Sequence, residues 1–398
     1  MSIVNLARVS FRIFFTGQQR RIRKRRYTGS PASICRQIVE RCYNKKHEFF
    51  QTSADTYPEL WSRDFGRCVP ALIHTGYEAE VTKSYHFALR AYQRAGRFEL
   101  TILPDGGLYN FPFGTYAPDG FAFLLYGLCA LGNHELVRNH FHFLSREAMR
   151  FFRLVVNPTD GSVKSTVHFS EAQDYLRRDA SCYTTSICYI VQQALTRLGI
   201  PNPLENFNYP HLLLSKYYNA NLDYFYDDEN RRPYISGDAN ILPYWSGAVH
   251  PNSPTSFDAV LASVDNAHLT GPFPMRYRNG TEKLPSLRLD HLNPWQSSSV
   301  WTCLGIHLLE TLYLYNRSRF HEERKQLELL VTQERCFPEV VDSRTRRLYS
   351  YPLYVAETSM LWAANFLNLL QNNPRVAHEH LRPFGEENRH DTKHQTTH

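Results

Sequence analysis

The sequence predicts an all-α fold in which six helical hairpins close into a ring, an (α/α)6 toroid. Apolar residues recur at i, i+3 and i+4 spacing along most of the chain, which is typical of amphipathic helices. Polar clusters open every second one of these helices at a nearly constant interval. No long Pro-, Ser- or Gly-rich linker divides the chain, so the helices are expected to form one domain.

The apolar periodicity predicts twelve helices, separated by stretches rich in Pro, Gly, Asn and Asp. They cover residues 32–49, 64–76, 79–95, 119–131, 133–153, 179–198, 207–220, 238–247, 256–264, 295–315, 320–334 and 357–371. The connecting segments carry turn residues, as at 103–107 and 157–161. Short β-hairpins are therefore expected among the loops at the rim of the ring.

The polar clusters indicate a repeat of two helices. They are Arg63-Asp64, Pro118-Asp119-Gly120, Arg178-Asp179, Gly237-Asp238-Ala239-Asn240, Trp295-Gln296-Ser297-Ser298 and Glu357-Thr358-Ser359. Measured between positions 64, 119, 179, 238, 297 and 357, the gaps are 55, 60, 59, 59 and 60 residues. Such a period is the pattern of a repeat architecture. With alternate helices lining the ring, all six clusters and the positive ends of six helices meet at one end, which predicts a polar pocket there.

Positive charge is concentrated at the N-terminus. The net charge is +7, but residues 1–31 hold eight Lys or Arg and no acid, which leaves −1 for the remainder. A nearly neutral body argues against nucleic-acid binding. We expect residues 1–31 to be a flexible basic extension, residues 32–371 the toroid, and residues 372–398 a polar disordered tail. The Arg-rich start is also compatible with organelle targeting.

Cysteine usage and hydropathy suggest a cytoplasmic protein with no membrane partner. No apolar run reaches the ~18–20 residues that a membrane span requires. The eight cysteines form no CxxC pairs and have no His at ligand spacing, so buried thiols in a reducing compartment are expected. We find neither a metal site nor a cofactor motif. The sequence does not indicate the oligomeric state.

Residues 57–66 are the strongest candidate for binding chemistry. This stretch combines three aromatic residues with the pair Arg63-Asp64 at the mouth of a predicted helix. Five guanidinium donors beside two carboxylate acceptors suit neighbouring hydroxyl groups, and Tyr and Trp rings can stack on sugars. The alternative is a surface ion pair that caps the helix.

Five short motifs share one order and spacing with a known enzyme group. They are Leu60-Trp61-Ser62-Arg63-Asp64, Ser236-Gly237-Asp238-Ala239-Asn240-Ile241-Leu242-Pro243, Pro294-Trp295-Gln296, Phe337-Pro338-Glu339-Val340-Val341-Asp342 and Ala356-Glu357-Thr358-Ser359-Met360-Leu361-Trp362. Through these motifs, residues 50–370 resemble the six-hairpin (α/α)6-barrel glycosidases, which include glucoamylases, trehalases, neutral invertases and amylo-α-1,6-glucosidases. The motifs do not assign a subfamily.

The resemblance implies two catalytic carboxyl groups, because glycoside hydrolysis requires an acid and a base or nucleophile. In the group the acid lies in the loop before the third inner helix, which implies Asp174 here, with Glu171 as the alternative. That loop lacks the Trp that often accompanies the acid, so both remain open. The loop before the sixth inner helix implies Glu339 as general base. The alternative is that Glu171 and Asp174 only cap the following helix.

The resemblance also implies a set of residues that contact the substrate. Arg63 and Asp64 would bind the sugar at the non-reducing end, giving exo action if a closed pocket lies behind them. Tyr116 and Trp245 are further candidate stacking residues, although each is equally consistent with core packing. The other candidates are Trp61, Asp119, Glu171, Asp238, Trp295 and Gln296, of which Asp119 and Asp238 could instead cap helices.

The chain lacks the N-terminal β-sandwich of many members, which favours a small carbohydrate substrate. We therefore expect an inverting, exo-acting glycoside hydrolase on an α-glucoside-type bond, with no cofactor and with the two carboxyl groups about 6.5–9.5 Å apart. The alternatives are a glycoside phosphorylase or lyase on the same barrel, and a non-catalytic carbohydrate-binding protein. Arg177-Arg178 would supply the anion site that a phosphorylase needs, whereas Glu339 argues for hydrolysis.

Overall fold

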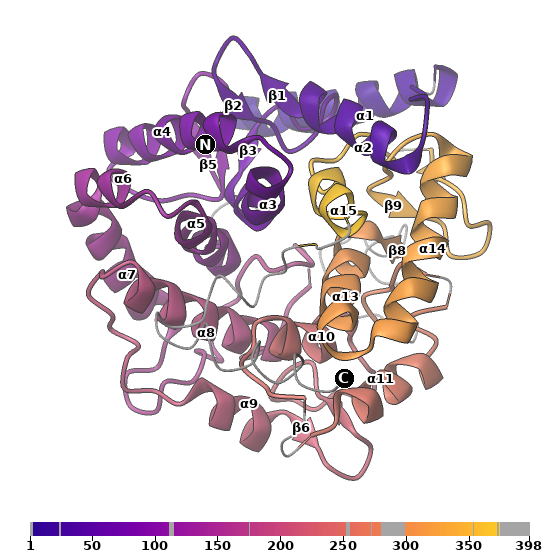
Figure 1. Cartoon of the computed structure of the whole chain (residues 1–398). Helices are drawn as coiled ribbons and strands as arrows, with labels where there is room; N and C mark the ends of the chain where they lie inside the picture. Colours follow the sequence, from indigo (N-terminus) through magenta and orange to yellow (C-terminus); the bar gives the residue numbers. More distant parts are fainter. Residues whose placement is uncertain are drawn as a thin grey trace, which may run out of the picture.

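The computed structural model describes residues 3–23, 25–110, 115–174, 176–251, 255–271, 273–279, 299–352, 354–371 and 374. Six inner helices enclose the centre of the molecule (Figure 1). They are α3 (Ser62–His74), α5 (Pro118–Leu131), α8 (Cys182–Arg197), α10 (Gly237–Trp245), α13 (Thr302–Tyr315) and α15 (Ala363–Leu369). Each packs against the next, and α15 returns to α3, so the ring is closed.

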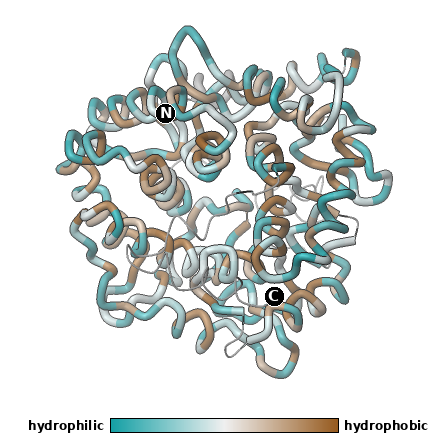
Figure 2. The backbone as a smooth tube through the Cα atoms, in the orientation of Figure 1, coloured by the Kyte–Doolittle hydropathy of each residue, from teal (hydrophilic) through white to brown (hydrophobic). Residues whose placement is uncertain are grey.

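A second layer of helices surrounds the ring (Figure 1). These are α2 (Pro31–Cys42), α4 (Glu78–Ala95), α6 (His134–Asn139), α7 (Phe141–Val155), α9 (Tyr209–Lys216), α11 (Phe257–Asn266) and α14 (Arg317–Glu334). In Figure 2 hydrophobic residues are concentrated along the inner helices, whereas outer loops are largely hydrophilic. The inner helices are apolar on most sides because they bury one face against the outer layer and another against their neighbours in the ring.

Short antiparallel strands connect the helices at the rim. The pairs are β1 (Tyr43–Asn44) with β2 (Phe49–Phe50), β3 (Leu60–Trp61) with β4 (Thr101–Ile102) and β4 with β5 (Leu108–Tyr109), β6 (Tyr218–Asn219) with β7 (Tyr224–Phe225), β8 (Val300–Trp301) with β9 (Val340–Val341), and β10 (Ser350–Tyr351) with β11 (Tyr354–Val355). Strands β3 and β8 run directly into α3 and α13. Their pairing therefore fixes where these two inner helices begin.

The close crossing of α3 and α5 depends on glycine. A Cβ atom on Gly66 would lie 2.1 Å from the backbone oxygen of Phe123, and one on Gly127 would lie 2.9 Å from the backbone oxygen of Gly66. Because no side chain fits at these two points, the helices approach with their backbones nearly in contact. This contact holds the first turns of α3 and α5 beside each other at the rim.

The expected all-α toroid is confirmed, and the structure has a helix within each of the twelve predicted stretches. The stretch 133–153 divides at His140 into α6 and α7. Helix α8 begins at Cys182, not near 179, because the Ser181 side chain caps it by accepting a hydrogen bond from the Thr184 amide. Helix α15 begins at 363, after an irregular turn at 357–362.

The N-terminal segment differs from the expected flexible extension. Residues Ile3–Ile22 form helix α1, which packs against β11. Its Arg20 is 5% exposed and forms an ion pair with Glu357. The sequence predicted a solvated arginine run because no local pattern identifies Glu357, a buried acid 337 positions away, as the partner of Arg20.

The described residues contain no helix that is both long and apolar enough to cross a membrane. All eight cysteines are buried, as expected. Most of the predicted tail, 372–398, lies outside the described residues.

Candidate active site

Arg63, in the first turn of α3, connects three segments at the rim. Its Nε forms a 2.7 Å ion pair with Asp119 of α5, and its Nη1 forms a 2.9 Å ion pair with Asp174 of the loop before α8. Its Nη2 donates to the Ser170 hydroxyl at 3.1 Å. Asp119 also accepts a 2.9 Å hydrogen bond from Tyr183 of α8. The structure thus brings three predicted site residues together, with Arg63 held by protein groups.

Asp174 is held at one oxygen and open at the other. Its Oδ1 accepts from Arg63 at 2.9 Å and from Ser170 at 3.2 Å, whereas no described residue donates to Oδ2. Burial raises the pKa of Asp174 to about 6, although the Arg63 charge opposes this shift. The side chain keeps 18% exposure, more than its partner Arg63. Its carboxyl group can therefore carry a proton near neutral pH and present it to a ligand.

Glu339 lies between α14 and β9, enclosed by hydrogen-bond donors. The Tyr354 hydroxyl donates to Oε2 at 2.5 Å, the Glu357 amide donates to Oε2 at 3.1 Å, and the Tyr57 hydroxyl donates to Oε1 at 3.3 Å. Burial raises the pKa of Glu339 to about 7, although the Tyr354 hydrogen bond opposes this shift. Three hydrogen-bond donors directed at one carboxyl group stabilise its ionised form relative to its protonated form.

Both carboxyl groups lie against the same stretch of chain. Asp174 contacts Arg63, whereas Glu339 contacts Tyr57, whose ring meets Trp61 with centroids 6.0 Å apart. Asp64, between these contacts and the ring interior, accepts a 2.7 Å hydrogen bond from the Trp362 indole. Residues 57–64 therefore connect the two candidate catalytic groups at the mouth of the toroid.

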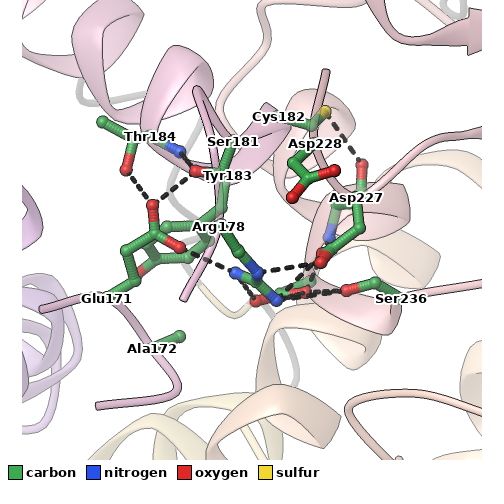
Figure 3. Close-up of polar contacts among 12 residues, drawn as sticks. Glu171, Ala172, Arg178, Ser181, Cys182, Tyr183, Thr184, Asp227, Asp228 and Ser236 are labelled. Carbon is green, nitrogen blue, oxygen red and sulfur yellow. Dashed lines mark hydrogen bonds and ion pairs between the residues drawn. The ribbon is translucent and has the colours of Figure 1, made fainter. Parts of the chain in front are cut away.

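Glu171, three residues before Asp174, belongs to a separate buried network (Figure 3). Its Oε2 forms a 3.0 Å ion pair with Arg178, and its Oε1 accepts from the hydroxyls of Ser181 and Thr184. Arg178 also pairs with Asp227 at 3.0 Å and Asp238 at 2.9 Å. One guanidinium thus joins three carboxylates, and Arg178 is not free to bind a phosphate ion.

The predicted aromatic residues fall into different environments. Trp245 is 1% exposed and packs in the ring interior, where its indole donates to Glu310 at 2.5 Å. Tyr116 packs among Phe98, Phe151 and the Arg150 guanidinium. Trp61 is partly exposed and meets Tyr57 and Tyr109 edge to face. Trp295 and Gln296 lie outside the described residues.

Three residues near the site were not predicted to hold the candidate acids. Tyr57 and Tyr354 donate to Glu339, and Trp362 donates to Asp64. Tyr57 belongs to the stretch 57–66 and Trp362 to the last of the five motifs, whereas Tyr354 lies outside both. Glu357, also in the last motif, pairs with Arg20. No group of three His, Cys, Asp or Glu among the described residues is arranged to hold a metal ion.

Solved structures of glycosidases resemble this chain in fold. A glycosidase variant in complex with glucose matches with a TM-score of 0.61 and 10% identity, over 94% of this chain and 98% of that one. A bacterial glucoamylase complexed with acarbose matches with a TM-score of 0.60 and 14% identity, over 88% and 57%. A rhamnosidase from Klebsiella oxytoca with rhamnose bound matches with a TM-score of 0.57 and 12% identity, over 86% and 64%.

At such low identities the likeness shows the fold alone. The chain is built as an all-α toroid like these glycosidases, which agrees with the architecture expected from the sequence motifs. No protein-family model matches the chain, and no curated protein matches it in sequence.

Proposed function

We propose that this protein is a glycoside hydrolase that inverts the anomeric configuration and removes a terminal sugar from a small α-glucoside-type substrate. The observation that carries the proposal is the pair of carboxyl groups, Asp174 and Glu339, that contact one aromatic and charged segment, residues 57–64. Hydrolysis of a glycosidic bond needs two such groups on opposite sides of the anomeric carbon. The fold shared with solved glycosidases supports the reaction class.

The hydrogen bonds distinguish the roles of the two groups. Asp174 has a free oxygen that can carry the proton needed by the leaving group, so it is assigned as general acid. Glu339 accepts three donors that stabilise its ionised form, so it is assigned as general base toward water. Glu171 is less suited to donate a proton because both its oxygens are engaged with Arg178, Ser181 and Thr184.

Asp64 and Trp61 are assigned to the terminal sugar. Asp64 has one oxygen held by Trp362, and the other is available to accept from sugar hydroxyls. Trp61 offers a partly exposed aromatic face beside Tyr57. Arg63 would act mainly by orienting Asp174.

The test is a proton-NMR time course on a panel of α-linked disaccharides, with and without inorganic phosphate. Wild-type enzyme is expected to release the β-anomer first without needing phosphate. Glu339→Gln and Asp174→Asn should each lower kcat by about 10²–10⁴-fold, as removal of a general acid or base does. Asp105→Asn, in the β4–β5 turn, is the control and should keep full activity.

A second substrate separates the two roles. An α-glucosyl fluoride has a leaving group that needs little protonation, so Asp174→Asn should retain much of its rate on it while Glu339→Gln does not. Release of the α-anomer would contradict inversion, and a phosphate requirement would replace hydrolysis by phosphorolysis. Wild-type levels of turnover in Glu339→Gln would remove this residue from the mechanism.

A further inference from the structure

Arg67, one helical turn after Arg63 on α3, is a buried cation without an anionic partner. The residue is 6% exposed. Among the described residues, its only side-chain hydrogen-bond partner is His307 of α13, at 3.4 Å from Nη1, and its guanidinium also lies over the Trp362 ring, 5.4 Å from the centroid. No carboxylate of the described chain forms an ion pair with it.

The negative charge of Asp64, one turn earlier on α3, acts on Arg67 through space but forms no ion pair with it. Arginine can only donate, so His307 Nε2 must accept, and burial lowers the pKa of His307 well below its ordinary value. The ring is therefore neutral. Glu310 of α13 instead accepts from Trp245 at 2.5 Å and from Asn365 at 3.3 Å. A buried charge without an ion pair costs free energy, whereas the buried Arg20, Arg63 and Arg178 each pair with a carboxylate.

One edge of the guanidinium has no hydrogen-bond partner among the described residues. His307 contacts Nη1, whereas Nε is buried without an acceptor and no described side chain accepts from Nη2. Nε and Nη2 present parallel N–H groups on the same edge of a guanidinium, which is the geometry that binds two oxygens of one planar or tetrahedral oxyanion.

The position of this edge connects it with the sugar site. Trp362 contacts the Arg67 guanidinium on its ring face and donates its indole N–H to Asp64. Asp64 and Arg67 thus contact the same aromatic side chain, one turn apart on α3. Arg63, by comparison, is saturated by Asp119, Asp174 and Ser170 and cannot serve the same purpose.

We propose that Arg67 anchors an oxyanion subsite inside the ring, and that the sugar bound at Asp64 is acidic, with its carboxylate on the Nε–Nη2 edge of Arg67. This inference rests on the proposed hydrolase and refines its substrate, replacing the terminal glucose by a sugar acid with the same α-linkage. Inorganic phosphate shares the oxyanion chemistry and would occupy the same edge if the anion is a separate ion.

The test measures binding of monosaccharides, so it does not depend on turnover. Titration calorimetry compares glucuronate with glucose, which differ only in the carboxylate, and includes inorganic phosphate as a third ligand. Wild type is expected to bind glucuronate at least about tenfold more tightly than glucose. Arg67→Gln should weaken glucuronate binding about 10–100-fold, the value of charge-assisted hydrogen bonds, and change glucose binding less than about twofold.

Two further variants keep the test decisive. Arg67→Lys retains the positive charge but lacks the two parallel N–H groups of the guanidinium, so an intermediate affinity for glucuronate is expected. Arg90→Met removes an exposed arginine of α4 and should leave all three affinities unchanged. Because the Arg67 charge is unpaired, ligand-free Arg67→Gln should melt no lower than wild type, whereas a structural cation would lower the melting temperature when removed.

The outcomes separate the hypotheses. Equal binding of glucose and glucuronate by wild type, together with no phosphate binding that depends on Arg67, overturns the subsite. A glucuronate preference that survives in Arg67→Gln also overturns it. Phosphate binding that is lost in Arg67→Gln, without a glucuronate preference, supports the oxyanion subsite and assigns a free ion to it. A carboxylate preference that depends on Arg67 in a protein without hydrolytic activity supports the subsite and contradicts the proposed function.

Discussion

Glu171 and Asp174 show how neighbouring carboxyl groups acquire different chemistry. They stand three residues apart in one loop, yet Glu171 faces a buried cation shared by three acids, whereas Asp174 faces Arg63 with one oxygen free. Burial raises the pKa of both groups. The difference therefore lies in which oxygens are already engaged, a property that residue type and spacing do not encode.

The pH dependence of kcat/KM should report Asp174 and Glu339. The proposed reaction needs Glu339 ionised, which is favoured above its pKa of about 7, and Asp174 protonated, which is favoured below its pKa of about 6. The profile should be a bell with its maximum between about pH 6 and about pH 7. Tyr354→Phe removes a hydrogen bond that lowers the pKa of Glu339, so its maximum should move to higher pH. A maximum below pH 5 would contradict the assignment.

Removal of Arg178 should destabilise the protein strongly. Arg178→Met leaves Glu171, Asp227 and Asp238 buried without their cation, and breaking a buried ion pair in this way costs about 3–5 kcal/mol. The free energy of unfolding from urea titration measures the loss. The matched control is Arg177→Met, which alters an exposed neighbour and should change stability by less than about 0.5 kcal/mol. A similar small change in Arg178→Met would refute the structural role.

At the scale of elements, helix α1 supports the surroundings of Glu339. Arg12 pairs with Glu59 and donates to the Thr56 backbone oxygen, while Arg20 pairs with Glu357 and donates to the Val355 backbone oxygen. These contacts flank Tyr57 on one segment and Tyr354 on the other, the two tyrosines that donate to Glu339. A helix outside the ring therefore fixes groups at its mouth.

Loss of the Arg20 charge should affect both stability and pH dependence. Arg20→Gln leaves Glu357 buried beside Glu339 without its cation, and the negative charge of Glu357 raises the pKa of Glu339. We expect a stability loss of about 3–5 kcal/mol and an activity maximum at higher pH than in wild type. Urea titration and the pH profile of kcat/KM measure the two effects. Arg23→Gln, an exposed change just after α1, should alter neither.

The sequence predicted the ring but only part of the site. Helix periods and the spacing of polar clusters are properties of contiguous stretches, so the inner and outer helices could be located to within a few residues. Glu339 is surrounded by Tyr57 and Tyr354 from distant segments, and Arg20 reaches Glu357 from a run that read as solvated. Such contacts depend on how the ring closes, which no local pattern specifies.

At the scale of the whole molecule, the last inner helix is needed to complete the ring. Helix α15 packs on α2 and α3 from the start of the chain and on α13 beside it. A chain ending at residue 334 should therefore lose cooperative thermal unfolding, because apolar faces of α2 and α3 remain uncovered. Circular dichroism during heating measures this. Deletion of residues 375–398, most of the polar tail 372–398 predicted from the sequence, is the control and should preserve the transition.

The packing of α1 and α2 against the C-terminal segments also affects the order in which parts of the protein form during synthesis. A ribosome releases the N-terminal helices long before residues 339–369, which provide Glu339, Glu357 and the closing helix. Until then the ring is an open crescent whose first and last edges lack their partners. The candidate catalytic centre is thus among the last parts of the protein to form during synthesis. Until then we expect the chain to be inactive and its exposed apolar edge to need protection.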